Sequence, residues 1–329
     1  MKVLITGIGG FAGSHLAELL LKDGVEVYGL VRNKKVCPNL TYPHFAGKPL
    51  RDSLSLHEGD ICDSETLCKV IKEVQPDEIY HMAAISNVPY SVSHPQLTFE
   101  INFNGTRNLF DAVLEWGQNP KILFVGSSDC YGKISPSDLP VREECPIKPV
   151  SPYSLSKSAA DLLAFQYANS FDLHIVRARP FNHIGARQAT SFVCPSFAEQ
   201  IASIEAKKNE PILYTGNLKA QKDFTDVRDT VRAYELILKN GQKGEVYNIC
   251  RGEAYSIEMI LQKLIELSSE DIEYRPDPKR FRALDIPILV GDNSLLKSKT
   301  GWQPTIPLEQ SLEYLLNYHR SLLQNAGHN

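Results

Sequence analysis

The chain opens with a short apolar run that leads into a glycine-rich turn. Residues 2–6 are predicted to form a buried strand, and a helix is expected from about residue 10 to Lys22. Glycines at positions 7, 10 and 13 separate the two in a Gly-x-x-Gly-x-x-Gly spacing. Such glycines permit a tight turn, close approach of backbone to a pyrophosphate, and close helix–strand packing. Because a helix N-terminus also attracts anions, Gly7, Gly10, Phe11 and Gly13 are predicted to hold a dinucleotide.

Strands and helices alternate through the first half of the chain. We expect strands at 25–31, 54–58, 78–84, 121–125 and 174–179, and helices at 64–74 (capped by Ser64), 98–116 and from 152 onward. This alternation predicts an α/β fold, a doubly wound parallel sheet of the Rossmann type with ligands outside the carboxyl ends of the strands. Residues 1–178 are expected to bind the cofactor. Residues 179–329 are expected mainly to form a smaller C-terminal α/β substrate domain, with a segment at about 225–255 returning to the first domain.

The end of the second strand indicates which dinucleotide is bound. A site that prefers NAD usually has an acidic residue there for the ribose hydroxyls, but this chain has Val31 followed by Arg32 and the basic run 33–35. A cationic cluster suits a 2′-phosphate, which indicates NADP(H); the alternative is a solvated basic turn.

Three further residues are assigned to the cofactor from their places after expected strands. Asp60 is a candidate acceptor for the adenine amino group, with Ile61 beside it, and the small side chain of Ala83 lets the cofactor lie close. His81, inside a strand, is interpreted as a packed and hydrogen-bonded histidine.

Residues 151–157, Ser-Pro-Tyr-Ser-Leu-Ser-Lys, are predicted to begin a helix. Ser151 suits the N-cap and Pro152 the first helical position. Tyr153 and Lys157 lie one turn apart, so their side chains leave the same face. A neighbouring cation lowers the pKa of a phenol from its ordinary value of about 10, which makes a tunable proton donor. Taken alone, the pattern also fits an ordinary amphipathic helix.

Composition limits the classes of partner. Lys and Arg number 35 against 39 Asp and Glu, a net charge of −4, so no footprint for nucleic acid is visible. The seven cysteines are scattered without Cys-x-x-Cys, which favours reduced thiols in a cytoplasmic protein over disulfides or a structural zinc site. With no signal peptide, no apolar run of membrane-spanning length and no metal constellation, we expect a cytoplasmic protein that binds neither membrane nor metal.

In combination, these motifs are more specific than any one of them. With the glycine-rich turn, Ser127-Ser128 after a later strand and Tyr153 and Lys157 some two dozen residues on, the chain resembles the extended short-chain dehydrogenase/reductase superfamily over essentially its whole length. The resemblance implies that Tyr153 is the acid/base. It also implies that Lys157 holds the nicotinamide ribose and lowers the tyrosine pKa, and that Ser127 hydrogen-bonds the substrate oxygen. Asn102 looks like the family's structural asparagine. Members often dimerise through helices matching 98–116 and 152–170, which implies a homodimer.

The second half resembles enzymes that act on nucleotide sugars. Asn182 matches an asparagine that meets the diphosphate region. The stretch 216–224 resembles the Gly-Asn-Leu-x-Ala-x-Arg-Asp pattern of enzymes for GDP-sugars, with Asn217 kept and Lys222 in the place of the arginine. Arg282 resembles a second diphosphate-binding arginine. The resemblance therefore implies a GDP-sugar substrate, although Lys222 and Arg282 also fit solvent-exposed charge.

One residue bears on the reaction. Dehydratases for GDP-mannose carry Thr-Ser-Glu where this chain has Ser127-Ser128-Asp129. Aspartate is one methylene shorter, and a misplacement of about 1 Å costs on the order of a hundredfold in rate. We therefore expect NADPH-dependent reduction of the C4 ketone of GDP-4-keto-6-deoxy-D-mannose to GDP-D-rhamnose, with Tyr153 as proton donor and Asp129 as a weaker catalytic candidate. The alternatives are GDP-mannose 4,6-dehydratase, a nucleotide-sugar 4-epimerase that retains NAD, and a non-catalytic nucleotide-sugar-binding protein.

Overall fold

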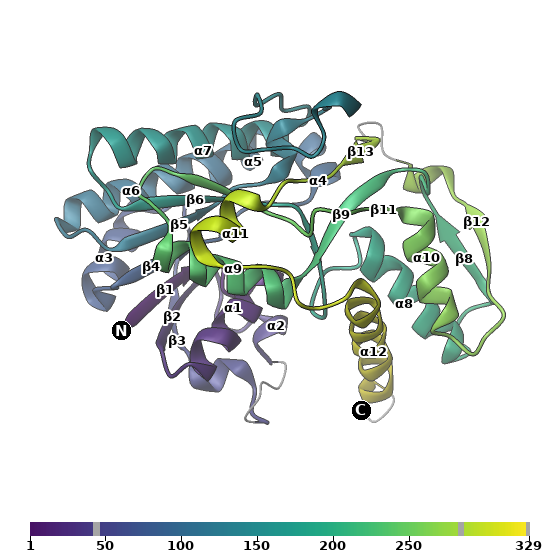
Figure 1. The fold of residues 1–329 in the computed structure, drawn as a ribbon. Helices are drawn as coiled ribbons and strands as arrows, with labels where there is room; N and C mark the ends of the chain where they lie inside the picture. The colour runs from purple at the N-terminus through teal and green to yellow at the C-terminus, as the bar shows by residue number, and fades with distance from the viewer. Residues whose placement is uncertain (42–46, 282–285, 327–329) are drawn as a thin grey trace.

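A computed structural model describes residues 1–41, 47–281 and 286–326. Figure 1 shows a larger part, in which helices cover both faces of a sheet, and a smaller part that includes the C-terminal helix.

A seven-stranded parallel sheet forms the centre of the larger part. Its order is β10-β6-β5-β4-β1-β2-β3, and every neighbouring pair is parallel. The strands are β1 Lys2–Thr6, β2 Glu26–Val31, β3 Ser55–Glu58, β4 Glu78–His81, β5 Lys121–Val125, β6 Ile175–Pro180 and β10 Val246–Ile249. The predicted doubly wound parallel sheet is therefore confirmed. Its order reverses at β1, where β2 lies on one side and β4 on the other, which is where such sheets bind ligands.

Two layers of helices bury the two faces of this sheet. The helices of the first face are α1 Phe11–Lys22, α9 Val227–Asn240 and α11 Ser294–Thr300, and those of the second are α3 Ser64–Val74, α6 Gly105–Trp116 and α7 Pro152–Ser170. Each layer forms its own apolar cluster with the strands (Figure 1). A short α2 (Pro38–Thr41) and the 3₁₀ turn η1 (Leu50–Ser53) lie within the segment that connects β2 to β3.

Local capping agrees with the sequence in one helix and differs in another. Ser151 caps α7. Its hydroxyl oxygen accepts from Ser154 N at 3.1 Å, and the hydroxyl oxygen of Ser154 accepts from Ser151 N. The expected cap at Ser64 is wrong, because the carboxylate of Asp63 accepts from Thr66 N at 3.1 Å and takes that role.

The expected helix at 98–116 is three consecutive segments. They are α5 Pro95–Phe99, the π-helical η2 Glu100–Asn104, and α6. Before them, α4 (Val88–Ser93) follows the loop that leaves β4, and η3 (Ser128–Tyr131) and η4 (Pro136–Asp138) follow β5. Single π turns within helices are rare and occur frequently at functional sites.

The smaller part contains two small sheets and three longer helices. One sheet joins β7 Asn182–Ile184, β9 Gln221–Asp226, β11 Ala254–Ser256 and β13 Ile288–Leu289; the other pairs β8 Ile212–Thr215 with β12 Glu273–Pro276. The helices that share its apolar cluster are α8 Val193–Glu205, α10 Ile257–Glu266 and α12 Leu308–Ala326. The 3₁₀ turn η5 (Pro278–Arg280) follows β12. Within the described ranges, no helix combines the length and apolar character needed to cross a membrane.

Candidate active site

One large cavity, of about 1390 Å³, is lined by both parts of the molecule. The carboxyl ends of the sheet strands supply one wall, and residues of the smaller part supply the other. Of the residues singled out from the sequence as site candidates, all that the structure describes line this cavity. They are Gly7, Gly10, Phe11, Gly13, Arg32, Asp60, Ile61, Ala83, Ser127, Asp129, Tyr153, Lys157, Asn182, Asn217 and Lys222. The remaining candidate, Arg282, lies outside the described residues.

The glycine-rich turn is held by close backbone contacts. Gly7 has φ +76°, and a Cβ on it would lie 2.7 Å from the backbone nitrogen of Ala83. A Cβ on Gly13 would lie 2.4 Å from the Gly7 carbonyl oxygen. These two positions admit no side chain without moving backbone, so the turn brings bare peptide groups to the cavity. Gly10 occupies the N-cap of α1, and Phe11 is its first residue.

The basic turn after β2 and the acidic residue after β3 lie at the same cavity. Arg32 is exposed at the mouth. Asp60 Oδ1 accepts from Cys62 N at 2.9 Å, which fixes the carboxylate, while the neighbouring Ile61 is buried. This arrangement suits the adenosine half of a dinucleotide, with Arg32 available to a phosphate.

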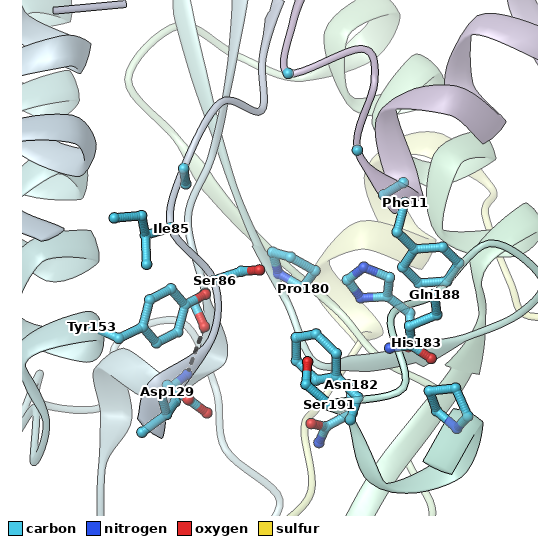
Figure 2. Close-up of a pocket in the computed structure, with 18 of the residues that line it drawn as sticks. Phe11, Ile85, Ser86, Asp129, Tyr153, Pro180, Asn182, His183, Gln188 and Ser191 are labelled. Carbon is cyan, nitrogen blue, oxygen red and sulfur yellow. Dashed lines mark hydrogen bonds between the residues drawn. The ribbon is translucent and has the colours of Figure 1, made fainter. Parts of the chain in front are cut away.

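Ser127 and Asp129 follow directly from β5. Ser127 is buried, its Oγ accepts from Asp129 N at 3.2 Å, and it is also hydrogen-bonded to Tyr153. Asp129 is only partly buried. Figure 2 shows Tyr153 and Asp129 on one wall of the cavity and Asn182, His183 and Phe11 on the opposite wall.

The pKa of Tyr153 differs from the expectation. Burial raises it above the ordinary value, the negative charge of Asp129 raises it further, and the hydrogen bond with Ser127 acts in the opposite direction. Lys157 was expected to lower this pKa, whereas the net shift is upward. Tyr153 is therefore a protonated phenol at neutral pH.

Lys157 is buried one turn along α7. Its Nζ lies 4.7 Å from the centroid of the Phe124 ring, a cation–π distance. Burial lowers its pKa to about 8, while the carboxylate of Asp161 on the next turn acts against that decrease.

Asn102 joins the π turn to the strand end and to α7. Its Nδ2 donates to Ile85 O at 3.0 Å and to Ser156 Oγ at 2.9 Å, and its Oδ1 accepts from Ile85 N at 2.8 Å. This geometry agrees with a structural role. His81 is likewise packed: its ring nitrogens contact Thr6 Oγ1 and Thr106 Oγ1 at 2.7 and 2.9 Å, and burial lowers its pKa to about 3.

The far end of the cavity contains several polar groups. Asn182 is exposed to it, and Asn217 Oδ1 accepts from Lys219 N at 3.0 Å. Lys222 donates from Nζ to Ile286 O at 2.6 Å. If Lys222 also binds an anion, its ammonium does so while it holds this backbone hydrogen bond.

Sequence reasoning missed two cations at this end. Lys279 and Arg280, both in η5, line the cavity, and Arg280 donates to Ser196 Oγ at 2.9 Å. A Cβ on Gly216 would lie 2.5 Å from the carbonyl oxygen of Arg280, so this turn packs directly on the β8–β9 connection. Lys279 and Arg280 precede Arg282 by two or three residues, and this basic segment was the sequence feature that could have indicated them. In the described part of the chain, no group of three or more His, Cys, Asp or Glu residues is arranged to hold a metal ion.

Comparison with known proteins assigns the chain to a family. Residues 4–315 match the family described as GDP-mannose 4,6 dehydratase. The chain is 32% identical over 316 residues to GDP-6-deoxy-D-mannose reductase of Pseudomonas aeruginosa, covering 96% of both sequences. It is 30% identical over 345 residues to human GDP-mannose 4,6 dehydratase, covering 98% of this chain and 92% of that one.

Solved structures agree with this assignment. RMD from P. aeruginosa, in complex with NADPH, superposes with a TM-score of 0.83 at 30% identity and covers 98% of this chain and 99% of its own. A UDP-glucose 4-epimerase from Thermus thermophilus, in complex with NAD, gives 0.84 at 28% identity, with 97% and 99% covered. The fold, the glycine-rich turn and the matches along nearly the whole chain lead to one conclusion: this protein belongs to the GDP-mannose 4,6-dehydratase family of extended short-chain dehydrogenases/reductases.

Proposed function

We propose that this enzyme reduces the C4 ketone of GDP-4-keto-6-deoxy-D-mannose with NADPH, giving GDP-D-rhamnose. The observation that carries the proposal is that Ser127, Tyr153 and Lys157 line one cavity, with Tyr153 and Lys157 one turn apart on α7. Reduction needs a proton donor for the oxygen that becomes an alkoxide as hydride arrives at carbon. Burial and the charge of Asp129 hold Tyr153 in that donor form.

The cofactor is NADP(H). The glycine-rich turn and the N-terminus of α1 suit its pyrophosphate, and Arg32 suits a 2′-phosphate in place of the acidic residue typical of NAD sites. The related RMD structure contains NADPH. Bound there, the nicotinamide supplies the hydride.

The side chains around the reacting carbon have separate roles in orienting the substrate, donating the proton and binding the cofactor. Ser127 hydrogen-bonds the keto oxygen and positions it for Tyr153, which gives up its proton. Lys157, charged below its pKa of about 8, binds the nicotinamide ribose and attracts negative charge that develops nearby. Asn102 holds α7 and the β4 loop in register through Ser156 and Ile85.

The GDP-sugar is held between the two parts of the molecule. We assign residues 1–178, together with α9 and β10, to the cofactor domain, because β10 pairs with β6 and α9 covers the same face of the sheet as α1. Helix α11 packs on that face as well, and the remaining residues of 179–329 form the substrate domain. Its lining residues Asn182, Asn217 and Lys222 bind the nucleotide diphosphate, and Arg282 is proposed to join them.

GDP-mannose 4,6-dehydration is the second candidate. The family match and the carboxylate of Asp129 at the cavity favour it. That reaction, however, also moves protons at C5 and C6, and Asp129 is one methylene shorter than the glutamate of the Thr-Ser-Glu pattern that dehydratases carry there.

Two parallel reactions test the choice. One contains GDP-4-keto-6-deoxy-D-mannose with stoichiometric NADPH, and the other GDP-mannose with catalytic NADP⁺; absorbance at the nicotinamide band and NMR of the sugars are followed. NADPH consumption in the first alone supports the reductase. Conversion of GDP-mannose without net change in the cofactor would replace it with the dehydratase.

We also propose a homodimer built on α5 and α7. Four large apolar side chains of these helices, Leu97, Leu155, Leu162 and Phe165, are 43–55% exposed. A second copy would bury them. Leu162→Glu is expected to give a monomer in sedimentation experiments, whereas Leu322→Glu on α12, at an exposed leucine elsewhere, is expected to leave the dimer intact. A monomeric parent protein would refute the interface.

The cytoplasm is the proposed compartment. All seven cysteines are unpaired in the structure, as is usual under reducing conditions. Retention of activity after export to an oxidising compartment, with new disulfides found by mass spectrometry, would argue against it.

A further inference from the structure

Tyr234 is a second tyrosine of the cavity that no sequence motif indicated. It lies on α9, on the face of the sheet opposite to α7, and its side chain is fully buried. It packs in the apolar cluster that α1 and α9 share with the strands, and it also lines the large cavity. Tyr153 and Tyr234 thus approach the cavity from the two opposite helical layers.

The hydroxyl of Tyr234 has no hydrogen-bond partner among the described residues. A buried hydroxyl without a partner destabilises the folded state, and phenylalanine at the same place would avoid that cost. Tyr80, in the same cluster, shows the usual solution: its hydroxyl donates to Glu78 at 3.2 Å. The unpaired group of Tyr234 therefore points to a bound molecule as its partner.

The sheet order places Tyr234 at the nicotinamide half of the cofactor. Helix α9 contacts β5 and β6, which end at Val125 and Pro180, and Ser127 follows β5 by two residues. Arg32 and Asp60, the candidates for the adenosine half, follow β2 and β3 at the other side of the sheet. Tyr234 also lies near enough to Tyr153 for a charge on Tyr153 to raise its pKa.

We propose that the Tyr234 hydroxyl hydrogen-bonds the carboxamide of the nicotinamide ring and so fixes the orientation of the ring toward Tyr153. The inference rests on the proposed NADP(H) function. A phenol matches this group because it can donate to the amide carbonyl or accept from the amide N–H. The contact lies on the side of the sheet away from α7, which leaves the Ser127–Tyr153 wall for the sugar.

Binding measurements test the contact without reference to turnover. NADPH is titrated into wild-type protein and Tyr234→Phe, and protein fluorescence gives Kd. The same titration with 2′,5′-ADP, which lacks the nicotinamide, checks the adenosine half and the integrity of the fold. We expect Tyr234→Phe to weaken NADPH binding on the order of tenfold and to leave 2′,5′-ADP binding unchanged. Its melting temperature without ligand is expected to equal or exceed that of the wild type.

Tyr80→Phe is the matched control, since it removes a buried hydroxyl of the same cluster that already has a partner and lies off the cavity. It is expected to leave Kd for NADPH unchanged. Equal NADPH affinity in wild type and Tyr234→Phe would overturn the proposal, as would a lower melting temperature with unchanged affinity, which would indicate a buried water as the partner. Loss of affinity for both ligands would overturn it as well, because the effect would not be local to the nicotinamide. If the wild type itself bound no NADPH, the proposed function would fail first.

Discussion

The ammonium of Lys157 lies 4.7 Å from the centroid of the Phe124 ring, at the carboxyl side of the sheet. Phe124 is fully buried in β5 and Lys157 is itself only 4% exposed, so the side chain is largely removed from water. This is the physical cause of its lowered pKa of about 8, and it gives the first prediction.

The unfolded chain binds a proton at Lys157 up to its ordinary pKa near 10.5, whereas the folded protein releases it above about 8. The unfolded state therefore binds more protons between these values, and the free energy of unfolding contributed by this residue rises with pH across that window. Between about pH 7.5 and pH 10, wild-type protein should gain roughly 2 kcal/mol relative to Lys157→Met. Urea unfolding of both proteins measures the difference. A constant difference across this range would show that the lysine is not desolvated.

Tyr153→Phe should lower kcat by a factor of roughly 10²–10⁴, because it removes the proton donor and leaves the rest of the cavity in place. NADPH affinity, measured by fluorescence, should change little. Tyr90→Phe on the exposed surface of α4 serves as the control and should retain full turnover. A Tyr153→Phe enzyme with near wild-type kcat would remove tyrosine from the mechanism.

Asp129→Asn removes a negative charge that raises the pKa of Tyr153. The phenol should then lose its proton at lower pH, and a spectrophotometric titration of tyrosinate absorbance should show this as a difference between the curves of Asp129→Asn and wild type. Asp138→Asn, at an exposed site in η4, should leave the titration curve in place. An unshifted curve in Asp129→Asn would mean that the carboxylate does not act on Tyr153.

Gly7→Ala and Gly24→Ala compare two glycines of nearly equal backbone geometry, with φ +76° and +74°. Both substitutions carry the strain of a left-handed residue, about 1 kcal/mol. At Gly7 the new methyl also lies 2.7 Å from Ala83 N, whereas at Gly24 it meets nothing within 4 Å. We expect Gly7→Ala to lower the melting temperature much further and to abolish NADPH binding, and Gly24→Ala to bind normally. Equal effects would mean that only the backbone conformation matters.

Arg32→Ala should weaken NADPH binding by roughly ten- to a hundredfold and leave NADH binding nearly unchanged, because only NADPH carries the 2′-phosphate. Arg107→Ala, on the exposed side of α6, should affect neither. Titration at two salt concentrations adds a second reading, since the contribution of Arg32 is electrostatic and should decrease with salt. If Arg32→Ala weakened the binding of NADPH and NADH equally, Arg32 would not be a ligand of the 2′-phosphate.

Much of the fold follows from patterns that are local in the chain. The apolar run before Gly7 forms β1, the Ser151 cap begins α7, and the four-residue spacing of Tyr153 and Lys157 brings both to the cavity. These features depend on backbone geometry within one or two turns, which the sequence alone specifies. The π turn at 100–104 does not belong to this class, because Asn102 is held there by Ile85 and Ser156, which come from other parts of the chain.

Tertiary structure decided the properties that depend on distance and burial. The sequence places a lysine one helical turn from Tyr153. The upward shift of the tyrosine pKa, however, is caused by desolvation and by Asp129, which follows β5. Lys222 was assigned to a phosphate, and only the packed chain shows its ammonium on the Ile286 carbonyl. Tyr234 reaches the cavity because α9 returns to the sheet of the first half. Each of these properties depends on electrostatic and packing contacts between residues that are far apart in the sequence. A local sequence pattern therefore cannot predict them.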